Sequence, residues 1–253
     1  MPRINFLNTH IDNLTMNEAL NVVDELITRE SPSYVVTPNL DHIVKIETDA
    51  EFSRIYADAD LVVADGKPLI WISRLLKTPI KEKISGSDLF PRICELAARK
   101  GYSIYILGAA EGVGQKAANN LKKRYHNLTI AGVYSPKIGF EKDSDELKRI
   151  KEVILEAKPD ILAVSLGSPK GEKFIYRHLQ EYGVPLSISI GATIDFEAGN
   201  IKRAPKWISE IGFEWMFRIT QDPKRLVKRY WNDAVKILPI IIKYKGKHNA
   251  SFD

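Results

Sequence analysis

The sequence holds almost none of the residues that form covalent cross-links or metal clusters. Cys94 is its single cysteine among 253 residues, which excludes an internal disulfide and any cysteine-based zinc site. The five histidines are scattered, without HxxxH or HExxH spacing, so the sequence does not predict a histidine metal site.

Long apolar runs, internal repeats and low-complexity tracts are also missing. No stretch of about 18 apolar residues occurs, so the sequence predicts no membrane-spanning helix. The first residues, MPRINFLNTHID, lack the apolar core of a signal peptide, and we therefore expect a cytoplasmic location. Apolar residues make up 44% and charged residues 27% of the chain, which is typical of a globular protein with one sizeable core.

Most of the chain carries no net positive charge, and the excess of basic residues is concentrated at its end. Residues 201–253 carry 12 lysines and arginines against 5 acidic residues, whereas residues 1–200 carry 25 against 27. Three of the four tryptophans, Trp207, Trp215 and Trp231, also lie in this tail. A basic, tryptophan-bearing tail on a near-neutral body indicates an anionic partner, namely a nucleic acid, a lipid headgroup or a diphosphate.

Short β-rich segments alternate with helical segments as far as residue 195. The nearly continuous apolar runs are typical of strands covered on both faces. The alternation predicts a Rossmann-like α/β fold, a mainly parallel sheet with helices on both faces. Strands are expected at 33–37, 61–64, 103–108, 129–134, 161–167 and 186–191. Helices are expected at 16–27, 42–56, 89–100, 114–125, 145–157 and 172–183.

The alternation stops near residue 195. A turn-rich connector, DFEAGNIKRAPKW, leads into two expected helices at 205–220 and 223–242, and Pro239 is expected to kink or end the second. We therefore divide the chain into an α/β body, 1–195, and a basic helical C-terminal appendage, 196–253.

Polar side chains follow several strands, at the edge where ligands bind on parallel sheets. Thr37 and Asn39 can hold a sugar or phosphate there, although the motif alone favours a turn and helix cap for TPN. Asp65 follows the run LVVA, where low-dielectric surroundings are expected to raise its pKa and suit it to act as a general base. An Asx-type turn residue is the equal alternative for Asp65. Asp195, at the end of LSISIGATID, is a third candidate carboxylate.

Two glycine-bearing loops follow strands and open helices. Gly108, Gly112 and Gly114 allow backbone N–H groups to approach a diphosphate. Their spacing is GxxxGxG rather than GxGxxG, and no acidic residue occupies the usual ribose-binding place, so a nucleotide diphosphate other than NAD fits at least as well. The second loop, GSPKGE (167–172), offers Lys170 for a phosphate or Glu172 for a hydroxyl. Plain turns are the structural alternative for both loops.

Two D-x-D strings resemble the metal-binding pair of metal-dependent sugar transferases. Their positions, 58–60 before a strand and 143–145 at a helix start, favour helix caps and solvated charges, so no metal is predicted. Without a metal, cationic side chains must stabilise a leaving diphosphate. The tail supplies Arg218, Arg225, Lys228 and Arg229, of which 218, 225 and 229 can share a helical face. A solvated basic face and contact with anionic lipid are the other two interpretations.

Several strings together resemble the WecG/TagA/CpsF glycosyltransferase family, in order from about residue 5 to 231. They are TPNLDH, LVVADGKPL, KISGSDLF, YILGAAEGVGQKA, VSLGSPKGEKF, SIGATIDFEAGNIKRAPKWISEIGFEW and RITQDPKRLVKRY. The resemblance implies an inverting, metal-independent enzyme that needs no cofactor and works at the inner face of the cell membrane. Its substrates would be a UDP-sugar donor and a polyprenyl-diphosphate-linked sugar acceptor. In the TagA branch the sugar is N-acetylmannosamine and the product leads to wall teichoic acid.

The resemblance also assigns roles to residues of this chain. It implies that Asp65 is the base, that Thr37 and Asn39 belong to the catalytic pocket, and that the appendage arginines complete the site. It further implies that the appendage contacts an anionic membrane surface, or that its apolar surface is hidden in a homo-oligomer. The implied donor-binding residues are Gly108, Ala109, Glu111, Gly112, Gly114, Gly167, Pro169, Lys170, Glu172 and Asp195.

Two positions depart from the family pattern. Gly171 replaces a glutamine of G-x-P-x-Q-E that would help to hold the donor sugar, which leaves the kind of sugar open, and Lys83 stands where arginine is common. Two other functions are alternatives. The sequence lacks the glycine spacing that is usual in a nucleotide-dependent oxidoreductase, and nucleic-acid binding would rest on the basic tail alone. We expect no nucleic-acid partner.

Overall fold

The centre of the protein is a six-stranded parallel sheet. The computed structural model describes residues 2–205, 208, 214–221 and 223–249, and the strand order is β4-β3-β8-β7-β5-β6. The strands are β3 (Ser33–Val36), β4 (Leu61–Val62), β5 (Ser103–Gly108), β6 (Thr129–Tyr134), β7 (Ile161–Ser165) and β8 (Leu186–Ser189). All six expected strands and the Rossmann-like α/β class are thus confirmed.

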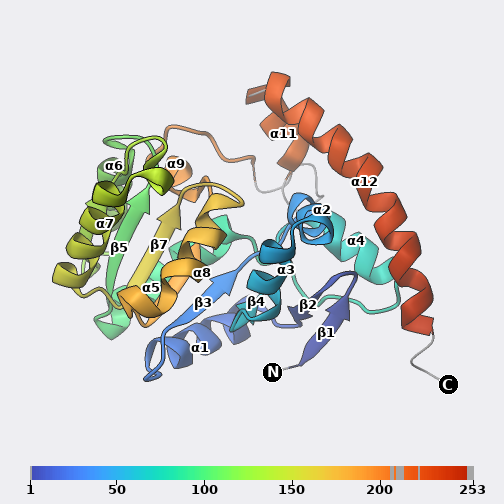
Figure 1. Cartoon of the computed structure of the whole chain (residues 1–253), viewed down its shortest axis with the longest axis horizontal. Coiled ribbons are helices and arrows are strands. Elements are labelled where there is room, and N and C mark those ends of the chain that lie inside the picture. The colour runs from blue at the N-terminus through green and yellow to red at the C-terminus, as the bar shows by residue number, and fades with distance from the viewer. Residues whose placement is uncertain (1, 206–207, 209–213, 222, 250–253) are drawn as a thin grey trace.

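Helices cover both faces of the sheet (Figure 1). One face packs against α1 (Met16–Ile27), α5 (Gly86–Lys100), α6 (Val113–Arg124) and α9 (Thr193–Glu197). The other packs against α2 (Leu40–Thr48), α3 (Ala50–Ala57), α4 (Lys67–Leu75), α7 (Ser144–Ala157) and α8 (Lys170–Tyr182), with the short η1 (Phe140–Lys142) beside α7. Successive strand residues alternate between the two cores: Val35 points to the first and Val36 to the second. This alternation explains the unbroken apolar runs.

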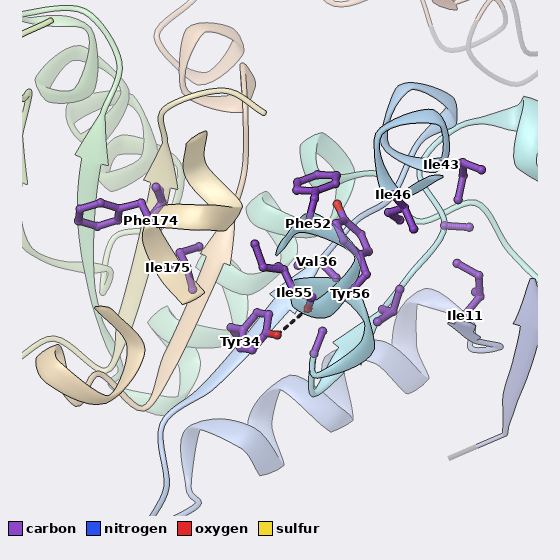
Figure 2. Close-up of a cluster of buried hydrophobic side chains, with 14 of the residues drawn as sticks. Ile11, Tyr34, Val36, Ile43, Ile46, Phe52, Ile55, Tyr56, Phe174 and Ile175 are labelled. Atoms are coloured by element: carbon purple, nitrogen blue, oxygen red, sulfur yellow. Dashed lines mark hydrogen bonds between the residues drawn. The ribbon is translucent and has the colours of Figure 1, made fainter. Parts of the chain in front are cut away.

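The second core joins the strands to α2, α3 and α8. Figure 2 shows Phe52, Ile55 and Tyr56 of α3 gathered over Tyr34 and Val36 of β3, with the Tyr34 hydroxyl donating to the Ile55 carbonyl. This packing fixes the direction in which α2 leaves β3, and α2 carries one wall of the site described below.

At two places in the sheet, neighbouring strands are followed by helices on opposite faces. Helix α2 follows β3 on one face and α9 follows the neighbouring β8 on the other. In the same way, α6 and α8 leave the neighbouring strands β5 and β7 on opposite faces. Crevices beyond the carboxyl ends of strands at such points are where open α/β sheets bind ligands.

The appendage lies beyond the β4 edge of the sheet, on the side of α2 and α4 (Figure 1). It contains α11 (Glu214–Gln221) and α12 (Pro223–Asn249). Ile237 and Ile240 of α12 are buried in the second core, and Lys243 forms an ion pair with Glu47 of α2. The proposed boundary between body and appendage stays a prediction. None of the helices in the described ranges is long and apolar enough to cross a membrane.

Several expectations about individual elements were wrong. Helix α12 runs through Pro239 to residue 249, so the alternative that it ends at the proline was wrong, while a kink there stays a prediction. The expected helix 42–56 is divided at Asp49, whose extended backbone ends α2 and whose carboxylate caps α3. Helix α5 begins at Gly86, before the expected start at residue 89, and Ser85 caps it. Residues 206–207 and 209–213, within the expected helix 205–220, lie outside the described residues.

Two further elements were not among the expected helices and strands. An antiparallel hairpin, β1 (Arg3–Phe6) and β2 (Thr9–Asp12), precedes α1. Asp12 ties it to the sheet by accepting hydrogen bonds from the Val62 N–H and Arg3. Helix α4 directly follows Asp65 and begins at Lys67 after Gly66, whose φ of 104° suits glycine.

Candidate functional site

Three loops meet at the carboxyl ends of β3 and β4. The Asp65 N–H donates to the Pro38 carbonyl at 2.8 Å, and the Ile84 N–H donates to the Ala64 carbonyl at 2.8 Å. These backbone bonds place the segments after β3, after β4 and before α5 side by side. The expected convergence of polar residues at this edge is therefore present for Asn39 and Asp65.

A cavity of about 330 Å³ opens above this junction, and the appendage lines its far side. Asn39 and Asp65 line it from the body, while Glu214 of α11 and Arg229 of α12 line it from the appendage. The cavity thus brings together one residue of each predicted kind: the candidate base, a pocket amide and a tail cation.

Asn39 has the capping function considered for it, and its position leaves the binding function a prediction. Its side chain caps α2 by accepting from the His42 N–H at 3.3 Å, and it also lines the cavity. Burial lowers the pKa of His42 to about 4, so this histidine is neutral at pH 7. Its Nδ1 lies 3.0 Å from the Tyr56 hydroxyl. Thr37 is buried beside Gly86 and is not among the residues that line the cavity.

The first glycine loop joins β5 to α6. A Cβ on Gly108 would collide with the backbone carbonyl of Ser165, where the ends of β5 and β7 approach closely, and one on Gly114 would lie 2.6 Å from Val133. These two glycines therefore have packing reasons of their own. Ala109 donates its N–H to the Ser165 carbonyl, and that N–H is consequently occupied.

A second cavity, of about 440 Å³, adjoins this loop. Glu111 and Gly112 line it from the loop, and Tyr134 and Ser135 line it from the end of β6. Tyr134 is fixed by donating its hydroxyl to Glu146 at 2.9 Å. The cavity is therefore a preformed space beside two of the predicted donor-binding residues.

The second glycine loop is held on α2. Lys45 donates to Asp41 at 2.6 Å and reaches both the carbonyl and the hydroxyl of Ser168 at 3.4 Å. Gly167 and Pro169 flank this contact and lead into α8. Lys170 points instead to Glu141 of η1, with which it forms an ion pair at 2.5 Å.

Glu172 and Gly171 are buried in the first turn of α8. Glu172 is buried, accepts from the Ser189 hydroxyl at 3.2 Å, and burial raises its pKa to about 7. A Cβ on Gly171 would lie 2.8 Å from that same hydroxyl. The space of a side chain at 171 is therefore taken by Ser189, which gives a physical reason for glycine at this position.

Asp195 does not lie at the end of a strand. Strand β8 ends at Ser189, and Asp195 sits in the short helix α9. Burial raises its pKa, but it is not among the residues that line either cavity. Its expected position at a strand end was wrong.

The tail cations are placed differently from one another. Arg229 lines the main cavity, and its Nε atom is buried with no hydrogen-bond acceptor among the described residues. Lys228 is exposed and does not line the cavity. The backbones of Arg218 and Arg225 belong to α11 and α12, but their side chains lie outside the described part of the chain.

Sequence reasoning left the role of Lys83 undefined and gave Asp88 no part in the site, although both lie in the quoted string KISGSDLF. Lys83 lines the cavity and donates to Asp88 at 2.7 Å. Burial opposes the charged form, but Asp88, Asp65 and Glu214 together raise the pKa of Lys83. Asp88 also accepts from Ser85 at 2.6 Å and from Arg203 of the connector. Asp88 therefore joins the cavity wall to the segment that leads into the appendage.

Replacing Asp88 with asparagine should lower the free energy of unfolding by about 2 kcal/mol, because Lys83 would lose its ion-pair partner inside the protein. The melting temperature should fall by roughly 4–8 °C. The matched control is Glu152→Gln, which breaks an exposed pair with Lys148 at 3.9 Å and should have almost no effect. An unchanged melting temperature for Asp88→Asn would show that Asp88 does not hold the cavity wall and the connector together.

The D-x-D strings have structural positions. Asp60 accepts from the Tyr34 N–H at 3.0 Å, and Asp143 caps α7 through the N–H groups of Asp145 and Glu146. Within the described residues, no group of three or more histidine, cysteine or acidic residues is arranged to hold a metal ion. The interpretation of both strings as caps and surface charges agrees with these contacts.

An α/β body with glycine loops, a carboxylate beyond a strand end and a cationic appendage that lines the same cavity has the features of a transferase of phosphate-activated groups. The chain belongs to the glycosyl transferase WecG/TagA/CpsF family, whose model matches residues 4–251. It is therefore a glycosyltransferase, and the family does not support the oxidoreductase alternative.

Curated relatives carry the same name in three species. The chain is 30% identical over 199 residues to the N-acetylglucosaminyldiphosphoundecaprenol N-acetyl-beta-D-mannosaminyltransferase of Bacillus subtilis, covering 79% of this chain and 75% of that one. It is 28% identical over 193 residues to the enzyme of Bacillus spizizenii, with 76% and 73% covered. It is 28% identical over 226 residues to that of Staphylococcus aureus strain MRSA252, with 88% and 87% covered.

Proposed function

We propose that this enzyme transfers N-acetylmannosamine, or a related hexose, from a UDP-sugar to a polyprenyl-diphosphate-linked acceptor sugar, with inversion and without a metal. The product would serve the synthesis of wall teichoic acid or another cell-surface polysaccharide. The observation that carries the proposal is the main cavity, because it brings Asp65 of the body and Arg229 of the appendage to one place. The names of the relatives supply the class of acceptor and sugar.

The proposed reaction is a direct displacement. Asp65 accepts the proton of the acceptor hydroxyl, whose oxygen attacks the anomeric carbon of the donor. The bond between that carbon and the diphosphate oxygen breaks, and UDP leaves with the electron pair. Asp65 lines the cavity just beyond the end of β4. A carboxylate there can come within hydrogen-bond distance of the acceptor hydroxyl, as a general base must.

Cationic groups would stabilise the leaving diphosphate. Arg229 is the best-supported candidate, because its side chain lines the cavity and its buried Nε has no acceptor among the described residues. Backbone N–H groups of the loop around Gly112, at the N-terminus of α6, would add to this stabilisation. The cavity between Glu111 and Tyr134 adjoins that loop, and we place the nucleoside there.

We further propose that the outer face of α12 holds the enzyme on an anionic membrane surface from the cytoplasmic side. Five apolar residues form a stripe along this exposed face, at spacings of 4, 4, 3 and 4: Val227, Trp231, Val235, Leu238 and Ile242. Exposed lysines accompany the stripe at 224, 228, 236 and 245. A helix with an apolar stripe and flanking lysines is suited to lie at a lipid interface.

Calorimetric titration with UDP, with and without a chelator, tests the donor class and the absence of a metal. We expect a dissociation constant in the micromolar range that the chelator leaves unchanged, and a panel of UDP-sugars would then identify the donor. Absence of UDP binding would refute a UDP-sugar donor. Binding that requires added Mn²⁺ would refute metal independence.

A further inference from the structure

The main cavity contains a carboxyl group that the proposed reaction does not use. Asp233 lies on α12 one turn after Arg229, lines the cavity and is only 3% exposed. Among the described residues none donates a hydrogen bond to its side chain or forms an ion pair with it. By contrast, the neighbouring Asp41 is paired with Lys45 at 2.6 Å.

A buried carboxyl group without a partner is unfavourable, and a protein retains one most readily where a ligand supplies the partner. The surroundings of Asp233 restrict what that partner can be. Asp41 on α2 faces it with a like charge, which disfavours a phosphate at this point. Arg229, Lys45 and Lys236 lie near enough to act on it electrostatically, which disfavours a cation. A neutral donor, such as a hydroxyl or an amide N–H, satisfies both conditions.

The remaining wall of the cavity points to the same chemistry. Trp71 of α4, which is 47% exposed, and Tyr230 of α12 both line the cavity. An aromatic face packs against the C–H side of a sugar ring, while a carboxyl group takes the hydroxyls at the ring edge. Burial, followed by the charge of Asp41, raises the pKa of Asp233 to about 6, and a carboxyl group can bind a hydroxyl in either protonation state.

The position of the cavity distinguishes the two sugars. It lies at the carboxyl ends of β3 and β4 and is lined by Asp65, whereas the first glycine loop follows β5, which β8 and β7 separate from β3. A sugar between Asp65 and α12 is therefore the one whose hydroxyl Asp65 would deprotonate. We propose that Asp233 is a specificity-determining residue that hydrogen-bonds the acceptor sugar. This inference rests on the proposed function.

Steady-state kinetics of the full chain would test the assignment, with UDP-N-acetylmannosamine as donor and farnesyl-diphosphate-linked N-acetylglucosamine as acceptor. Asp233→Ala should raise the KM for the acceptor at least about tenfold, as expected when a charged group loses a hydrogen bond. The calorimetric affinity for UDP should change less than about twofold. The matched control is Asn232→Ala, an exposed neighbour on the same helix.

Acceptors that lack a single ring hydroxyl give a readout that a structural role of Asp233 would not change. The wild-type protein should discriminate strongly against the analogue that lacks the hydroxyl to which Asp233 binds in the complete acceptor. In Asp233→Ala that discrimination should shrink to nearly none for the same analogue, whereas Asp233→Asn, whose amide can still hydrogen-bond a hydroxyl, should retain part of it. The proposal is overturned if the acceptor KM is unchanged in Asp233→Ala, or if Asp233→Ala discriminates among the analogues as the wild type does.

The proposed function can fail separately. If the wild-type protein transfers no sugar to this acceptor, equilibrium binding of the same acceptor decides the matter. Binding that Asp233→Ala weakens would retain the sugar site although the proposed reaction is wrong. No binding at all would overturn both.

Discussion

Replacing Asp65 with asparagine should lower kcat about 10³-fold, because the amide keeps the shape of the side chain but cannot accept the proton of the acceptor hydroxyl. The affinity for UDP should change less than about twofold, since UDP is proposed to bind through the glycine loops and Arg229. Single-turnover kinetics measures the first quantity and calorimetry the second. Measuring both separates loss of the base from loss of the donor site.

The control for this prediction is Asp145→Asn. Asp145 is exposed in the first turn of α7 and belongs to one of the two D-x-D strings. Its substitution should leave kcat within about twofold, as for surface positions away from the site. An unchanged kcat in Asp65→Asn would exclude Asp65 as the base. A fall in kcat accompanied by an equal loss of UDP affinity would assign Asp65 to donor binding.

The parallel sheet was predictable from the sequence because its strands are buried on both faces. Val35, Ile104, Ile106, Ile161 and Ile188 are all fully buried, and such strands produce continuous apolar runs. The hairpin near the N-terminus has no comparable pattern. Its turn places Leu7 at φ 51° without glycine or asparagine at that position, so the usual turn signal is absent. It depends on tertiary contact between Asp12 and Val62.

Helix ends were predicted only in part, and least well where packing sets them. Gly101 ends α5 in the left-handed conformation, as its sequence indicates. Pro239 was expected to kink or end α12, but its neighbours Ile237 and Ile240 are buried in the core shared with α2. That packing accounts for helix beyond the proline, because tertiary contacts outweigh local propensity.

The site could be predicted only in part for a similar reason. Asp65 and Asn39 follow strands directly, so the alternation of strands and helices was enough to place them at the ligand edge. Lys83 and Asp233 reach the cavity only because the segment before α5 and the long helix α12 return to that edge. No pattern in the sequence states which face of α12 packs on α2, since both of its faces carry apolar residues.

The outer face of α12 provides the last prediction. Replacing Trp231, Leu238 and Ile242 with serine should weaken binding to vesicles of phosphatidylcholine and phosphatidylglycerol at least about 100-fold. Each large apolar side chain contributes about 1.5–3 kcal/mol when it is removed from water. These three side chains are exposed, with 74%, 61% and 74% of their surface accessible. The melting temperature should therefore stay the same, and vesicle co-sedimentation measures the binding.

The matched control replaces Ile138 and Leu155, which are also exposed apolar residues but lie on the body. Ile138→Ser with Leu155→Ser should leave vesicle binding unchanged, because those residues are not part of the stripe on α12. Added salt should weaken wild-type binding further, since the lysines of α12 act through a screened attraction. Full binding by the triple variant would refute the membrane proposal. A change in its sedimentation coefficient without vesicles would instead show that the stripe joins copies of the chain.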